Sequence, residues 1–239
     1  MRHLNQFITE YIIKKKLDKP IDSEYKYHPK SKDELIENIK ELLDEGETNL
    51  NCINTSAITD MVRLFSDTSI KTKIKNINID ISKWNVHNVK NMKGMFFEYS
   101  NFNCDLSGWN VSNVTDMSFM FDSCKKFEGK GLENWNVSNV TNMRYMFSNC
   151  DNFKGESIEN LNVSNVTNMI SMFENCINFD CDLSNWDVSN VKDMSFMFDN
   201  CKKFKGKGLE NWDVSNVKDM SFTFDGCTSL KNKPNWYKE

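Results

Sequence analysis

Hydrophobic and polar residues follow a pattern that repeats along most of the chain. One copy, WNVSNVTDMSFMFDSCKKF, begins at Trp109. All copies begin at Trp84, Trp109, Trp135, Leu161, Trp186 and Trp212, with a degenerate one at Ile53. Successive starts from Trp84 onward are 25, 26, 26, 25 and 26 residues apart. A repeat of this length is typical of architectures in which similar units stack on one another.

Large apolar residues recur at the same positions of each copy. All methionines except the initiator occupy two of these positions, and a phenylalanine follows the second. Residues that recur once per repeat are expected to form the interior of a stack in which each coil covers the next. The phenylalanine column comprises Phe65, Phe96, Phe121, Phe147, Phe173, Phe198 and Phe224.

The segment WNVSNVTNM is rich in β-branched and aromatic residues, and it is short and rich in Asn. It therefore predicts one or two short strands in each repeat. The following segment, M-F-x-x-C-x-x-F, has room for a helical turn. We accordingly expect a repeat solenoid with short parallel β-strands and helical turns in each coil.

The repeat W-[ND]-V-S-N-V-[TK]-[DN]-M-x-x-M-F-x-x-C-x-x-F resembles that of the BspA-like leucine-rich-repeat surface proteins, from Ile53 to Trp236. The resemblance implies a leucine-rich-repeat-like solenoid and a role in adhesion or protein–protein recognition. It also implies a cell-surface location. The residues themselves show no recognisable signal peptide or anchor, which favours a cytoplasmic or particle-associated protein.

The first 50 residues lack the repeat, which divides the chain into an α-helical segment and cap, 1–50, and a solenoid of about six to seven repeats, 51–239. Ser31 and Glu34 form a candidate capping box, and Gly46 is placed to end a helix over Lys32–Glu45 that caps the first coil. Its predicted apolar face comprises Leu35, Ile36, Ile39, Leu42 and Leu43. A second helix, over Met1–Leu17, is an alternative docking or oligomerisation element.

The last copy departs from the pattern, because Thr223 replaces the second methionine and Leu230 replaces the second phenylalanine. A polar residue in this column is expected in a coil that has no neighbour beyond it. The sequence thus favours a complete chain.

The net charge of -4 gives no global basic field, so nucleic-acid binding is not expected. Nowhere do 18 apolar residues run together, so no membrane span is expected either. The 17 Phe, 13 Met and 6 Trp residues indicate a folded chain rather than a disordered one.

The eight cysteines first suggest disulfides or zinc, but most form one repeat column and no C-x-x-C pair exists. Buried free thiols in a reducing compartment are the preferred interpretation. With three histidines and no acid–base constellation, no catalytic, cofactor or metal site is predicted. The repeat column that includes Asp116 holds Asp or Asn in each copy, so a calcium site formed by these oxygen ligands is an alternative. An Asn column is interpreted as a ladder that satisfies backbone groups: Asn88, Asn113, Asn139, Asn165, Asn190 and Asn216.

Positions that vary between copies are the candidate partner-binding surface. The residue before the second methionine is large and aromatic in four copies, as Phe119, Tyr145, Phe196 and Phe222, but it is Gly94 and Ser171 in two others. These aromatics either form an exposed recognition stripe or are partly buried against the adjacent coil. The linkers CKKFEGKG and CKKFKGKG carry Lys126 and Lys203, which either meet an acidic partner or form a solvated edge.

The sequence therefore predicts a non-catalytic protein–protein interaction module with a protein partner, adhesin-like if the family resemblance extends to function. The alternative is a structural or assembly component of a particle or envelope, attached through its N-terminal helix.

Overall fold

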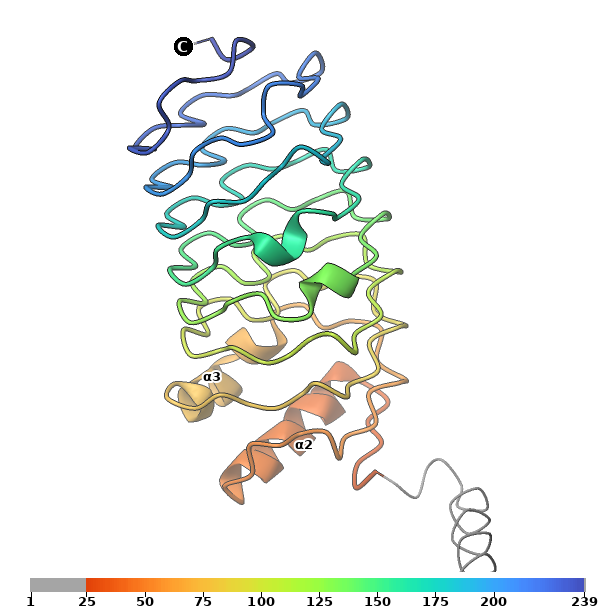
Figure 1. Cartoon of the computed structure of the whole chain (residues 1–239). Coiled ribbons are helices and arrows are strands. Elements are labelled where there is room, and N and C mark those ends of the chain that lie inside the picture. The colour runs from red at the N-terminus through yellow and green to blue at the C-terminus, as the bar shows by residue number, and fades with distance from the viewer. Residues whose placement is uncertain (1–24, 239) are drawn as a thin grey trace, which may run out of the picture.

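The structure is a computed structural model that describes residues 25–238, so the predicted helix over Met1–Leu17 lies outside the described residues. Successive repeats lie on top of one another from the N-terminal to the C-terminal side of the molecule (Figure 1). The described chain contains two α-helices, α2 (Lys32–Asp44) and α3 (Thr68–Ile74). Three short 3-10 helices accompany them: η2 (Leu64–Ser66), η3 (Leu132–Asn134) and η4 (Glu156–Ile158).

The predicted leucine-rich-repeat-like solenoid, with short parallel β-strands and a helical turn in each coil, is wrong. Residues 25–238 contain no β-strand and no sheet, and neighbouring coils meet through isolated parallel bridges of single residues. The M-F-x-x-C-x-x-F segments form successive turns rather than helices. The bridges between full copies involve Asn91, Asp116, Asn142, Asn168, Asp193 and Asp219.

Local hydrogen bonds explain why strands do not form. The Asp116 carboxylate accepts a hydrogen bond from the backbone nitrogen of Ser118 at 2.8 Å, and the Asn110 side chain accepts one from Ser112 at 3.1 Å. Such contacts compete with the hydrogen bonds of a sheet. Phe119 then adopts a left-handed backbone with φ 59°, and Ser123 does so with φ 64°, so an extended strand cannot continue.

Hydrogen bonds between coils replace the missing sheet. In the coil that begins at Trp109, four backbone N–H groups donate to carbonyl oxygens of the next coil at 2.8 to 3.0 Å, those of Met117, Phe119, Phe121 and Ser123. The Trp135 indole nitrogen donates to the Leu106 carbonyl oxygen of the preceding coil at 3.3 Å. The predicted Asn ladder is confirmed, since the amide of Asn139 donates to the carbonyl oxygen of Ser112 at 2.7 Å and its equivalents do likewise.

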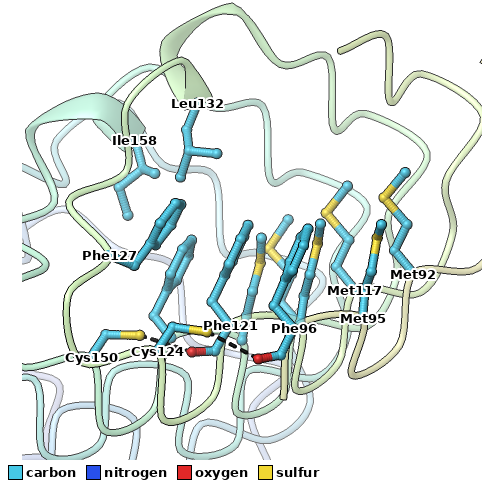
Figure 2. Close-up of a cluster of buried hydrophobic side chains, with 14 of the residues drawn as sticks. Met92, Met95, Phe96, Met117, Phe121, Cys124, Phe127, Leu132, Cys150 and Ile158 are labelled. Carbon is cyan, nitrogen blue, oxygen red and sulfur yellow. Dashed lines mark hydrogen bonds between the residues drawn. The ribbon is translucent and has the colours of Figure 1, made fainter. Parts of the chain in front are cut away.

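The methionine and phenylalanine columns form the continuous core (Figure 2). The rings of Phe121 and Phe147, in neighbouring coils, stack with centroids 5.6 Å apart. Within one coil, the ring of Phe121 lies 4.1 Å from that of Phe127. Each such side chain contributes roughly 1.5–3 kcal/mol through burial, and each depends on the neighbouring coil for its cover.

Helix α2 matches the predicted N-terminal helix to within one residue at its end. Ser31 caps it by accepting a hydrogen bond from the backbone nitrogen of Glu34, while the Glu34 carboxylate accepts one from the backbone of Lys30. Its buried face comprises Leu35, Ile39 and Leu42, and Ile36 and Leu43 pack at the margin. The helix lies across the N-terminal end of the stack (Figure 1). Helix α3 was not predicted; Asp67 caps it by accepting from the Ser69 backbone.

Candidate functional site

The four aromatic residues singled out in the sequence form two stacked pairs rather than one continuous row. The rings of Phe119 and Tyr145 lie 4.7 Å apart with an angle of 4°, and those of Phe196 and Phe222 lie 4.9 Å apart with an angle of 17°. Ser171 occupies the column between the pairs and is buried. We call the two pairs together the aromatic stripe.

The two pairs differ in exposure. Phe119 and Tyr145 are half-buried, whereas Phe196 is 37% exposed and Phe222 is 56% exposed. Each interpretation of the sequence therefore applies to part of the stripe: partial burial to the first pair and an exposed surface to the second.

All four aromatic residues have a left-handed backbone, with φ 59° at Phe119, 56° at Tyr145, 57° at Phe196 and 57° at Phe222. This conformation costs a side chain with a Cβ roughly 1–2 kcal/mol, but glycine adopts it freely. Gly94 has φ 60° at the equivalent position. The backbone thus favours glycine in this column, and it does not explain the aromatic side chains.

A basic side chain covers one pair. The Arg144 guanidinium lies 4.8 Å from the ring centroid of Phe119 and 5.8 Å from that of Tyr145. The equivalent residues beside the second pair are Ser195 and Ser221. Within residues 25–238 no cation lies over Phe196 or Phe222, so this pair presents its apolar surface to solvent.

Carboxylates border the exposed pair. Asp199 and Asp225 each follow one of its phenylalanines by three residues, and Phe222 and Asp225 line the same cleft. Burial, and then repulsion from Glu174 and Asp225, raises the pKa of the Asp199 carboxyl. The second pair therefore combines exposed rings with two nearby carboxyl groups.

The predicted lysines Lys126 and Lys203 are exposed in the linkers. Nearby linker lysines form ion pairs with the preceding coil, as Lys130 does with Asp105 at 2.8 Å and Lys207 with Asp182 at 2.6 Å. In the described part of the chain, no ion pair or cation–π contact joins Lys126 or Lys203 to the aromatic stripe. The lysines and the stripe are therefore separate candidate surfaces.

The left-handed backbone and the role of Arg144 were missed from the sequence. Gly94 was the only glycine in the stripe column and gave a weak signal. A second column with a left-handed backbone gave a clearer sequence signal, because it contains Asn and Gly, which adopt this conformation most readily. That column comprises Glu98, Ser123, Asn149, Asn175, Asn200 and Gly226.

The cysteine column is buried and its thiols are free, as the sequence indicated. The Cys124 thiol donates to the Phe96 carbonyl oxygen at 3.1 Å, and the Cys150 thiol does so to Phe121 at 3.0 Å (Figure 2). Burial raises the pKa of both thiols well above its usual value. These groups have the environment of structural rather than nucleophilic cysteines.

The column considered for calcium uses its oxygens within the fold. Asp193, for example, accepts hydrogen bonds from both the backbone nitrogen and the hydroxyl of Ser195. In residues 25–238, no group of three or more His, Cys, Asp or Glu side chains has the arrangement of a metal site. No helix in the same range combines the length and apolar character needed to cross a membrane.

The chain matches the family described as Mycoplasma protein of unknown function, DUF285, over residues 34–130 and 122–237. These ranges include α2 from Glu34 onward and all copies of the repeat. No curated protein and no solved structure is significantly similar to the chain.

Proposed function

The chain belongs to the DUF285 family, the BspA-like repeat family, and on that premise we propose that it is a non-catalytic protein-binding module that recognises its partner through the aromatic stripe. The resemblance seen in the sequence agrees with this membership. An adhesive role and a surface location remain predictions drawn from that resemblance.

The exposed stack of Phe196 on Phe222 carries the proposal. Large, rigid aromatic side chains supply much contact area at low entropic cost, and they are enriched among the residues that dominate binding energy. Here they occupy a left-handed backbone that favours glycine, and the buried core columns lie elsewhere in the coil. A contribution to binding would offset the backbone cost, which the small gain from stacking only partly balances.

The double substitution Phe196→Ser and Phe222→Ser tests the proposal. Ser171 already occupies the same column, so we expect the free energy of unfolding to change by less than about 1 kcal/mol. The partner is first retrieved from the native source by crosslinking and identified by mass spectrometry. Its affinity for the purified full chain is then measured, and the variant should lose at least about 2 kcal/mol of binding free energy.

Lys202→Ser serves as the matched control, because Lys202 is exposed in the same repeat and lies outside the stripe. An unchanged dissociation constant for the stripe variant would refute the proposal. So would an equal loss of affinity in the control.

A further inference from the structure

The peptide groups of the turn-forming segment are oriented in the same direction in every coil. The N–H groups of Met117, Phe119 and Phe121 face the next coil, where they donate to carbonyl oxygens. The carbonyl oxygens of Asp116 and Ser118, one residue earlier, face the preceding coil, where they accept from Met92 and Gly94. Alternate peptide dipoles in this segment therefore point along the stack.

Four columns of such bonds run through the stack. In one column, the first bond runs from the Met61 N–H to the Asn91 carbonyl oxygen. The last bond of that column runs from the Met194 N–H to the Asp219 carbonyl oxygen. Aligned peptide dipoles add up, as they do in an α-helix, and leave partial positive charge at the end with free N–H groups.

One full column runs the opposite way, from the Lys90 nitrogen on Thr59 to the Lys218 nitrogen on Lys192. Further backbone nitrogens also donate to the preceding coil, among them those of Lys126, Asn152 and Asp180. The summed peptide dipoles of the four columns exceed those of the opposing bonds.

The positive ends of the four columns meet at the last coil. The N–H groups there have no acceptor among residues 25–238, and they belong to Met220, Phe222, Phe224 and Gly226. At the opposite end of the stack, the Lys32 ammonium donates to the Val62 carbonyl oxygen. The chain thus places its own cation at the negative end. At the positive end, no carboxylate among residues 25–238 accepts from these four N–H groups.

A cleft of about 550 Å³ is lined by Met220 and Phe222 of this row, whereas Phe224 is buried. Its lining includes three lysines, Lys218, Lys233 and Lys238, and two aspartates, Asp219 and Asp225. The Asp219 carboxylate already accepts a hydrogen bond from the Ser221 backbone at 2.9 Å, and Lys233 lies over the ring of Tyr237. Together with the N–H row, the lysines favour a negatively charged ligand.

We propose that the edge formed by Met220 and Phe222 binds an acidic segment of a partner protein, whose carboxylate oxygens accept their two N–H groups. Carboxylates accept without donating, which matches a row that only donates. An uncharged extended backbone would bring its own N–H groups to the same row. A second copy stacked in register would have to displace α2, whose Lys32 occupies the complementary carbonyl.

The edge shares Phe222 with the aromatic stripe, but the two proposals use different groups of that residue, its backbone N–H and its side chain. Binding at the edge uses backbone N–H groups and the lysines of the cleft, whereas the aromatic stripe uses side chains. Either surface can therefore fail its test without affecting the other.

Titration of the ¹⁵N-labelled full chain with a decaglutamate peptide tests the proposal. The amide signals of Met220 and Phe222 should shift saturably, while that of Met117, which is bonded to the next coil, should stay in place. Binding should weaken as salt is added. A decaglutamine peptide of equal length is the ligand control and should not bind.

Lys218→Glu combined with Lys238→Glu should weaken decaglutamate binding by at least about tenfold. The matched control is Lys202→Glu combined with Lys203→Glu, two exposed lysines outside the cleft, which should change the affinity by less than about threefold. Asp225→Asn should tighten binding. Equal binding of decaglutamine, shifts that omit the amides of Met220 and Phe222, or an equal effect of the control pair would each overturn the proposal.

Discussion

The Cys150 thiol donates a hydrogen bond to the carbonyl oxygen of Phe121 in the preceding coil, and the same carbonyl accepts the backbone nitrogen of Cys124 at 2.9 Å. One buried oxygen therefore joins the turn of its own coil to the side chain of the next. Four further thiols make the equivalent bond, those of Cys124, Cys176, Cys201 and Cys227.

Cys150→Ala should lower the free energy of unfolding by about 1–2 kcal/mol, because it removes a hydrogen bond and packed sulfur from a fully buried position. Cys52→Ala is the control. Cys52 is only half-buried, and its substitution should cost less than about 1 kcal/mol. Urea denaturation measures both, and an equal loss in the two variants would contradict a structural role for the column.

The thiols should also differ in reactivity. Seven cysteines are buried and Cys52 is intermediate. Burial raises the pKa of the column thiols, so little thiolate forms at neutral or mildly alkaline pH. A chromogenic thiol reagent at pH 8 should therefore label Cys52 first, and the other seven only as fast as the chain unfolds. Rapid labelling of several thiols in the folded chain would argue against this packing.

Gly131 and Gly46 form a matched pair for testing the linkers. Both have a left-handed backbone, with φ 93° and 83°, but a Cβ on Gly131 would overlap the backbone of Ser107, whereas one on Gly46 would meet nothing within 4 Å. Gly131→Ala should cost at least about 3 kcal/mol and Gly46→Ala about 1 kcal/mol. Similar melting temperatures for the two variants would show that the coils can separate to admit the methyl group.

Phe147 and Phe224 compare a middle coil with the last one. Phe147 stacks between Phe121 and Phe173 of the neighbouring coils. Phe224 stacks on Phe198 on one side and makes a T-shaped contact with Tyr237. Phe147→Ala should cost about 3–5 kcal/mol and Phe224→Ala clearly less. Chemical denaturation distinguishes them, and equal losses would mean that the C-terminal residues cover the core as well as a coil does.

Asp122→Asn should stabilise the protein at pH 7. Burial, followed by repulsion from Glu98 and Glu174, raises the pKa of the Asp122 carboxyl in the folded state. Ionisation therefore costs the folded state more than the unfolded one, so stability rises as pH falls through the folded pKa. Asn keeps the oxygen that accepts from Asn149 and Ser123.

We expect a gain of less than about 1 kcal/mol at pH 7, because hydrogen bonds from Asn149 and Ser123 offset part of the cost of burying the charge. The gain should vanish below the unfolded pKa of about 4, where the native residue is also neutral. Thermal melts of both proteins at pH 7 and pH 3 measure it. A gain that persists at pH 3 would point to a cause other than charge.

The sequence predicted what depends on periodicity. The methionine and phenylalanine columns, the Asn ladder and the helix ended by Gly46 each follow from residues whose spacing or capping chemistry has one main structural meaning. The buried cysteines followed from the same periodicity.

The strands could not be predicted correctly, because Val, Trp and Thr favour extended backbone in general while Asn, Asp and Ser close local turns here. The left-handed conformation of Phe119 and Tyr145 runs against the preference of bulky residues, so nothing in their identity indicated it. Nor does residue type encode the direction of peptide groups, which is why the donor row at Met220 emerged only from the structure.

Ser171 gives the aromatic stripe a fixed length scale. Because one coil without an aromatic residue separates Tyr145 from Phe196, the centres of the two pairs lie three coils apart, or about 14 Å at about 4.8 Å per coil. An extended partner chain spans that distance in about four residues, and a helical one in about nine. The number of coils thus sets the distance between the two aromatic pairs. A partner whose two anchoring groups match this spacing would engage both pairs at once and gain avidity from doing so.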